Sequence, residues 1–257
     1  MIFLRECERM KTAIVTDSTA YLTKEERDQY NIHMIPLSVN LPSGTYEEEV
    51  TITAEEFYEK VRSESEFPKT TQPPVGLFVG KFEQLEKDYV DMVTIHLSSG
   101  ISGTYNGAVQ SSQMVEGVNV FAFDSEIACG PQGMFAIEAA KMAAQGMSGA
   151  EIIAELEELK KTMDAYFGQK VIVPYEKIRT RKKAMRRVEE QLAAAVAIDP
   201  NLQAVIIHAN CESQGRDWLE QLAGEYPTVD FKLSYFGPVI GSHLGEGAIA
   251  MGWMAKK

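Results

Sequence analysis

The sequence predicts an α/β protein with two domains: an N-terminal, Rossmann-like parallel sheet with helices on both faces, and a smaller C-terminal α/β domain with a mixed sheet. Three observations lead to this fold class. Short β-branched runs alternate with helix-like segments through residue 163, which is typical of parallel βαβ units. The alternation changes after that point, so we place the domains at residues 10–163 and 164–257. A chain of 257 residues also buries roughly 73 % of its surface, which is enough for a core without disulfides.

The first domain is expected to contain three strands, each a short apolar run. They are Thr12–Thr16, Val90–Leu97 and Val118–Asp124. One helix is expected to begin at Thr53, because Thr53 and Glu56 have the spacing of a capping box. The expected helices are Leu22–Tyr30, Thr53 to about Val61, Thr104–Met114, Gly133–Gly146 and Ser148–Met163.

The second domain has a different pattern of shorter segments. A basic run, Arg179–Arg187, leads into a helix, and we expect Asp217–Tyr226 to form another. The segment Gly237–Gly247 is rich in glycine and is predicted to be a loop. The expected strands are Val171–Pro174, Gln203–Ala209 and Phe231–Phe236.

Composition excludes several classes of function. The net charge is −12, from 25 basic and 37 acidic residues, which opposes binding to nucleic acid or an anionic membrane. The basic run Arg179–Arg187 is followed by Glu189 and Glu190 and is therefore interpreted as a solvated helix face. Three cysteines without a CxxC pair, and no apolar stretch of 18 residues, are typical of a cytoplasmic protein with free thiols. We interpret Met1–Arg9 as a tail or an upstream-start artefact.

Three segments with small hydroxyl residues are candidates for ligand binding. Ser18 follows the first strand, where open α/β sheets bind ligands, and Thr70 and Thr71 precede two rigid prolines. Segment Ser98–Tyr105 follows a strand and opens a helix, so Ser102, Gly103 and Thr104 place hydroxyl and N–H donors at a helix start. This segment lacks a P-loop lysine, which favours a carboxylate over a polyphosphate. A helix cap or a polar loop is the structural alternative for each segment.

Histidines supply the other candidate. His243 stands in the glycine-rich segment, where there is little steric bulk, and a functional role is expected. His33, His96 and His208 lie in strand-like runs and are interpreted as structural. No histidine or cysteine spacing is typical of metal ligands, and we predict neither a metal nor a cofactor.

Taken together and in order, six segments resemble the DegV family of bacterial lipid-binding proteins. The resemblance covers most of residues 10–257. The segments are VTDST at Val15–Thr19, TTQPP at Thr70–Pro74, SSGISGTY at Ser98–Tyr105, FDSE at Phe123–Glu126, IRTRKKA at Ile178–Ala184 and GPVIGSHLGEGA at Gly237–Ala248.

The resemblance implies two α/β domains with a long-chain fatty acid between them. It also implies a non-catalytic acyl carrier that presents the carboxylate to a separate ATP-dependent fatty acid kinase, for acyl phosphate formation and phospholipid synthesis, with transient membrane contact for lipid exchange. Thr70 and Ser102 match the hydroxyls that hold the carboxylate, and Gly103 matches an N–H donor. His243 matches the histidine near the head group, and Arg179 matches an arginine of the second domain.

The chain departs from the family pattern at three places. Pro74 stands where serine is usual, and Glu246 stands where proline is usual. The family pattern is also tens of residues longer between Met163 and Ile178–Ala184, a region that normally helps to enclose the acyl tail. We therefore expect a C-terminal domain that is shortened relative to the family, with either a more open pocket or a lost segment.

Two other functions are open alternatives. A serine hydrolase or esterase would use Ser102 as nucleophile and His243 as base, although no G-x-S-x-G elbow occurs. A nucleotide-binding signalling protein would use Asp17 and the first sheet, although the G-x-G-x-x-G fingerprint does not follow the first strand.

Overall fold

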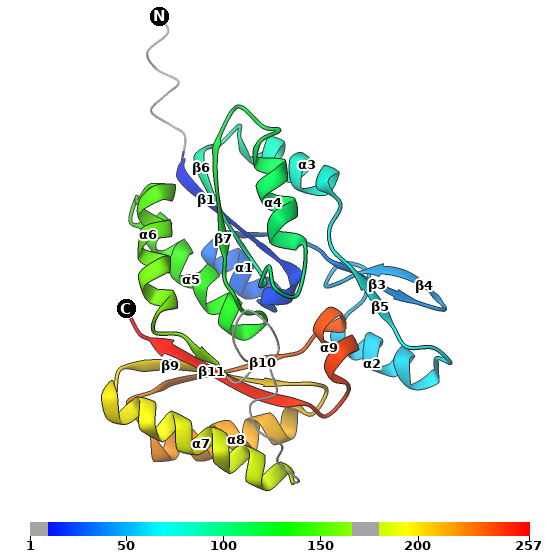
Figure 1. Ribbon diagram of the computed structural model, residues 1–257, viewed down its shortest axis with the longest axis vertical. Coiled ribbons are helices and arrows are strands. Elements are labelled where there is room, and N and C mark those ends of the chain that lie inside the picture. Colours follow the sequence, from blue (N-terminus) through cyan, green and yellow to red (C-terminus); the bar gives the residue numbers. More distant parts are fainter. Residues whose placement is uncertain (1–9, 166–179) are drawn as a thin grey trace, which may run out of the picture.

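The computed structural model describes residues 10–165 and 180–257 and consists of stacked layers of helices and sheets (Figure 1). A parallel sheet lies above a mixed sheet, and a pair of helices packs between them. A small antiparallel sheet projects from the side of this stack. The mixed α/β architecture agrees with the predicted fold class. The predicted strand Val171–Pro174 lies outside the described residues.

The first sheet contains four parallel strands in the order β2-β1-β6-β7. Its central strands are almost fully buried, which explains why they appear in the sequence as continuous apolar runs. The strands are β1 (Met10–Asp17), β2 (Ile32–Ile35), β6 (Tyr89–His96) and β7 (Asn119–Asp124).

Helices cover both faces of this sheet, as the sequence predicts. On one face lie α3 (Val75–Leu85) and α4 (Thr104–Ser112), which share a core with β1 and β6. On the other face lie α1 (Lys24–Tyr30), α5 (Gly130–Ala144) and α6 (Gly149–Lys160). The capping box expected at Thr53 and Glu56 is present and opens α2 (Ala54–Ser63).

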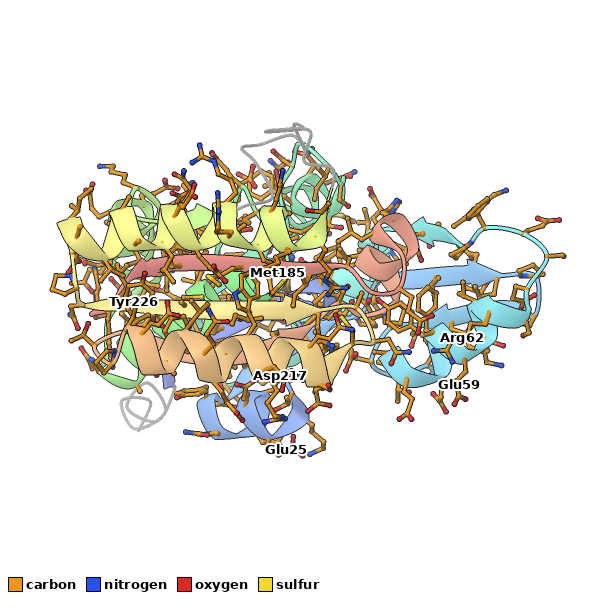
Figure 2. All side chains as sticks on the ribbon, turned by 90° about the horizontal axis from the view of Figure 1, so that it is seen from below. Glu25, Glu59, Arg62, Met185, Asp217 and Tyr226 are labelled. Carbon is orange, nitrogen blue, oxygen red and sulfur yellow. The ribbon has the colours of Figure 1, made fainter. Side chains whose placement is uncertain are left out.

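The second sheet is mixed, with the order β10-β9-β11-β8. Helices α7 (Arg181–Ile198) and α8 (Glu212–Glu225) lie side by side across its outer face (Figure 2). Helix α5 packs on its inner face, where a β-carbon at Gly130 would lie 2.6 Å from Val205, so glycine permits the close approach. The strands are β8 (Asp164–Ala165), β9 (Leu202–His208), β10 (Asp230–Tyr235) and β11 (Ile249–Ala255).

The third sheet is antiparallel, with the order β4-β3-β5, and packs against helix α9 (Pro238–Leu244). The prediction of a loop over Gly237–Gly247 is therefore wrong for its first part. Gly237 and Gly241 serve close packing, because a β-carbon at either position would collide with the ring of Tyr21 or the hydroxyl of Tyr58. The strands are β3 (Ser38–Leu41), β4 (Gly44–Glu47) and β5 (Lys69–Thr71).

No helix within the described part of the chain is long and apolar enough to cross a membrane.

Candidate functional site

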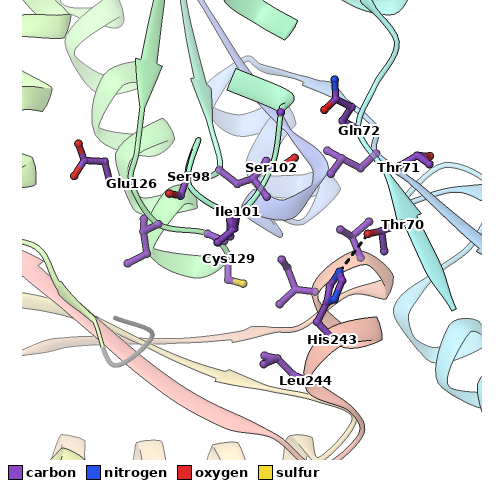
Figure 3. Close-up of a pocket in the computed structure, with 17 residues that line it drawn as sticks. Thr70, Thr71, Gln72, Ser98, Ile101, Ser102, Glu126, Cys129, His243 and Leu244 are labelled. Carbon is purple, nitrogen blue, oxygen red and sulfur yellow. Dashed lines mark hydrogen bonds between the residues drawn. The ribbon is translucent and has the colours of Figure 1, made fainter. Parts of the chain in front are cut away.

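A cavity of about 460 Å³ lies beyond the carboxyl ends of β6 and β7, where they face β5 and α9 (Figure 3). Open α/β sheets bind ligands at this edge, and small-molecule sites commonly have volumes of roughly 300–1,000 Å³. The four segments that meet here are far apart in the sequence. They are Thr70–Gln72, the 97–103 loop, residues 126–129 and helix α9.

One side of the cavity is polar. Thr70 and Thr71 come from β5, and the pairing of Thr70 with Val39 of β3 fixes the position of Thr70. His243 comes from the last turn of α9 and is exposed. Its imidazole Nε2 lies 3.2 Å from Thr70 Oγ1, in a hydrogen bond that joins the two segments (Figure 3).

The loop before α4 supplies further donors. The Ser102 N–H donates to Ser98 O at 3.1 Å, which folds the loop into a tight turn. Ser102 Oγ shares a 2.8 Å hydrogen bond with Thr104 Oγ1. Within residues 10–165 and 180–257, no acceptor is bonded to the Gly103 N–H, which lies at the N-cap of α4. A β-carbon at Gly103 would collide with the amide of Gln72, so glycine lets Gln72 approach this backbone.

The rest of the wall is mainly apolar. Ile101 is 40 % exposed although it lines the cavity, so its side chain has room for a further apolar partner. The Cys129 thiol also lines the wall, and burial, together with the charges of Glu48 and Asp17, holds its pKa well above the usual value. The thiol is therefore uncharged and weakly nucleophilic. Other apolar residues of the wall are Leu37, Leu97, Ile127, Val239 and Leu244.

One carboxylate belongs to the lining, so the cavity is less neutral than the sequence suggests. Glu126 has a left-handed backbone with φ of 58°, and the side chain lies away from Thr70 and His243 in Figure 3. Lys160 Nζ lies 3.7 Å from its carboxylate. The negative charge thus has a nearby cation and is separated from the hydroxyl and imidazole groups.

Six of the eight predicted site residues lie in the cavity wall or directly behind it. Thr70, Thr71, Ser102, Gly103 and His243 line the cavity together. Thr104 is buried directly behind Ser102 and bonds to it.

Two predicted residues are not part of this wall. Ser18 is 2 % exposed, and its hydroxyl donates to Glu48 Oε2 at 2.6 Å, so it acts behind the cavity rather than in it. Arg179 lies outside the described residues.

Asp17 belongs to the core, which contradicts its suggested role in nucleotide binding. It is 1 % exposed, and its Oδ2 accepts from the Leu97 N–H at 3.1 Å and contacts His96 Nδ1 at 2.9 Å. Desolvation alone would raise the pKa of Asp17, but the hydrogen bond and charge of His96, with help from Thr19 and Gln132, hold that pKa below its usual value. The pair fixes the start of the 97–103 loop, and His96 is structural as predicted.

Ser102 and His243 have separate hydrogen-bond partners in this structure. Ser102 Oγ bonds to Thr104, and His243 Nε2 bonds to Thr70. A serine nucleophile and its base lie within about 3 Å of each other when the pair is assembled. In the part of the chain that the structure describes, Ser102 and His243 do not form such a nucleophile–base pair.

Two of the departures have structural consequences. Pro74 precedes α3 and provides no side-chain cap, so this helix starts without the hydroxyl that a serine would offer. Glu246 follows α9 and accepts from Arg62 of α2 and, at 2.7 Å, from Asn210. Glu246 thus ties the chain after α9 to two other segments.

Sequence reasoning missed one buried residue next to the site. Glu48 lies in the acidic run Glu47–Glu49, which in sequence looks like a solvated charge cluster. It is 0 % exposed and bonds to α9. A charge run offers no signal for such burial.

Comparisons with known proteins relate the chain to one family. The model of the DegV family, described as uncharacterised proteins, matches residues 11–170 and 167–256. Protein DegV of Bacillus subtilis is 44 % identical over 281 aligned positions, which cover 96 % of this chain and 100 % of that protein. A DegV domain-containing protein of Listeria monocytogenes is 41 % identical, with 96 % of this chain and 99 % of that protein covered.

Solved structures agree with the sequence matches. The crystal structure of Bacillus subtilis DegV, described as a fatty acid binding protein, has a TM-score of 0.93 at 44 % identity and covers 96 % of this chain and 100 % of that one. A DegV lipid binding protein from Thermotoga maritima has a TM-score of 0.84 at 29 % identity, with 96 % and 99 % covered.

The comparisons also bear on the shortened region. The 281 aligned positions exceed the 257 residues of this chain, so Bacillus subtilis DegV has residues without a counterpart here. The family model matches in two pieces that meet at residues 167–170. The break coincides with the region after Met163 where the sequence analysis expects missing residues.

Proposed function

Since this chain belongs to the DegV family, we propose that its cavity binds one long-chain fatty acid and presents the carboxylate to a separate ATP-dependent fatty acid kinase. The homologous DegV of Bacillus subtilis is described as a fatty acid binding protein, and the Thermotoga maritima homologue as a lipid binding protein. The ligand would lie between the two domains that we propose, residues 10–163 and 164–257. No reaction is assigned to this chain itself; the kinase would form the acyl phosphate.

The observation that carries the proposal is the division of one cavity into a polar end and an apolar wall. Thr70 and His243, which bond to each other, line this cavity together with Ser102 and Gly103. A lone carboxylate suits such donors, because each charge-assisted hydrogen bond contributes about 1.5–3 kcal/mol. Desolvation of the carboxylate offsets much of this gain.

The apolar wall would bind the tail. Each buried CH₂ contributes about 0.8 kcal/mol, so a tail of about fifteen carbons offers roughly 12 kcal/mol before the cost of ordering it. The tail would therefore dominate affinity, and the polar end would orient the acid. Ile101, which is 40 % exposed and lines the cavity, would gain apolar cover from the bound chain.

Access at the polar end supports presentation to a partner. Thr71 and His243 are both exposed while they line the cavity. A carboxylate held there would be reachable from solvent, as phosphoryl transfer from a kinase requires. Exchange of the apolar tail would occur by transient contact with a membrane.

Native mass spectrometry before and after solvent extraction tests the binding claim. We expect an added mass of a C14–C18 fatty acid that is lost on denaturation. A protein that carries no lipid, and takes up none when fatty acid is added after extraction, would contradict it.

An ester assay separates a carrier from an esterase. A carrier does not turn over a chromogenic acyl ester, and Ser102→Ala weakens its lipid binding. An esterase turns over the ester and loses that activity in Ser102→Ala.

A further inference from the structure

Glu48 is a fully buried carboxyl group whose hydrogen bonds converge on the helix that carries His243. It lies just after β4 and is 0 % exposed. Its Oε1 accepts from the Val239 N–H at 2.7 Å and from the Tyr21 hydroxyl at 3.0 Å. Its Oε2 accepts from the Ser18 hydroxyl at 2.6 Å.

Helix α9 cannot cap its own N-terminus. Its N-cap residue, Gly237, has no side chain, and Pro238 has no N–H. The next two N–H groups are the orphan donors of the first turn. The Val239 N–H bonds to Glu48, and the Ile240 N–H bonds to the Tyr21 hydroxyl at 3.1 Å. The cap of α9 therefore comes from residues 191 and 219 positions away in the sequence.

The same contacts anchor α9 to the first sheet. Ser18 follows β1 directly, and its hydroxyl oxygen also accepts from the Leu37 N–H at 3.0 Å. Gly237 lies so close to Tyr21 that a β-carbon there would collide with the ring. Helix α9 is thus held between its capped first turn and the bond from His243 to Thr70.

We infer that Glu48 is a positioning residue, which caps α9 from a distance and thereby sets where His243 meets a ligand carboxylate. Val239 and Ile240, whose N–H groups are capped, also line the cavity. His243 lies one helical turn beyond Val239, so a shift of the first turn carries the imidazole with it. The part of this inference that concerns the ligand rests on the proposed function.

The chain offers a matched control for the loss of a buried carboxyl. Asp91 is 7 % exposed and accepts from the Gly149 N–H at 2.8 Å, at the first turn of α6, and from Asn119 at 2.9 Å. Like Glu48, Asp91 caps a helix that is distant in sequence. Asp91 is not among the residues that line the cavity.

The experiment compares Glu48→Ala, Glu48→Gln and Asp91→Ala in the full chain by two readouts. The first is the imidazole ¹H–¹³C NMR signal of His243 in lipid-free protein, assigned with His243→Asn and recorded at one fixed pH. The second is the dissociation constant for palmitate. The NMR readout needs no ligand, so it tests the positioning role even if the protein binds no fatty acid.

We expect Glu48→Ala to shift the His243 signal and to weaken palmitate binding about tenfold, the equivalent of one hydrogen bond. Glu48→Gln keeps a carbonyl acceptor for Val239 and should restore most of both readouts. Asp91→Ala should lower the unfolding temperature but change neither the His243 signal nor the dissociation constant for palmitate. A His243 signal that is unchanged in Glu48→Ala, or equally changed in Asp91→Ala, would overturn the inference.

A second variant keeps the test decisive if Glu48→Ala does not fold. Tyr21→Phe removes only the hydroxyl that links Glu48 to the Ile240 N–H. We expect a smaller shift of the His243 signal in folded Tyr21→Phe. A signal identical to that of the unaltered protein would overturn the inference.

Discussion

The imidazole Nε2 of His243 lies 3.2 Å from the hydroxyl oxygen of Thr70, although 173 positions separate the two residues. This contact joins the last turn of α9 to strand β5 and brings two predicted segments to one end of the cavity. It leaves Ser102 on the opposite loop as a separate donor. The polar end is therefore assembled from three independent parts of the fold.

Loss of two of these donors should weaken fatty acid binding more than loss of either. Thr70→Ala and Ser102→Ala each remove one hydroxyl that we propose bonds the carboxylate, and each should raise the dissociation constant for palmitate by about 10- to 100-fold. The double variant should bind palmitate more weakly than either single variant, as measured by titration calorimetry. Thr45→Ala, an exposed threonine of β4, is the control and should bind normally. Full lipid retention in the double variant would refute the head-group assignment.

His243 should matter more for transfer than for binding. His243 is exposed at the polar end, where its imidazole forms a hydrogen bond with Thr70. We expect His243→Ala to reduce acyl phosphate formation by a fatty acid kinase more than it weakens palmitate binding, with both measured on the same preparation. Unchanged acyl phosphate formation would contradict the proposed role of this histidine.

The buried pair of Asp17 and His96 should be a major source of stability. Asp17→Ala leaves the Leu97 and Thr19 N–H groups and His96 without their acceptor, which should cost about 3–5 kcal/mol in urea unfolding. Asp28→Ala, which breaks the exposed pair with Lys24, should change the unfolding free energy far less, because solvent screens this pair. Because the pKa of Asp17 is lowered, its contribution is present above the ordinary value of 3.8 and is lost on acidification below it. Equal losses in the two variants would refute this account.

Glu48 should make the protein less stable as pH rises. Burial raises the pKa of Glu48 from 4.5 to about 8, against the opposing effect of the Ser18, Val239 and Tyr21 hydrogen bonds. An acid with a raised pKa favours the folded state fully below pH 4.5, and this contribution is lost as pH rises through about 8.

Glu48→Gln removes this titration and no other. The difference in unfolding free energy between the unaltered protein and Glu48→Gln should therefore change by at most about 1.4 kcal/mol per pH unit between pH 4.5 and about 8. Thermal and urea unfolding at pH 4.5 to 8.5 measure it. A difference that stays constant across that range would contradict burial of an ionisable Glu48.

The parts of the fold that could be predicted are those with a local signal. The apolar run at Thr12–Thr16 forms the centre of β1, and the Thr53 and Glu56 spacing opens α2 as expected. Helix α9 could not be predicted, because Gly237 and Gly241 are typical of loops in sequence but serve here to admit the rings of Tyr21 and Tyr58. Glycine is required at these two positions by tertiary contacts, and the neighbouring residues in the sequence do not reveal such contacts.

The candidate site, too, could be predicted only where a residue has a local signal in the sequence. Hydroxyl-rich segments indicated Thr70, Ser102 and Gly103, and the structure brings them to one cavity. Ser18 and Asp17 have the same local signal but are buried in hydrogen bonds of the core. Side-chain direction separates the two groups, and it depends on packing between segments that are distant in sequence.

The most direct measurement is the ¹³C NMR signal of carboxyl-labelled palmitate bound to the lipid-free protein. The account predicts one resolved carboxyl resonance from the bound acid, displaced in Ser102→Ala and in Thr70→Ala but not in Thr45→Ala. A bound resonance that is indifferent to Thr70 and Ser102 would contradict the proposed carboxylate site. The absence of any bound resonance would contradict fatty acid binding itself.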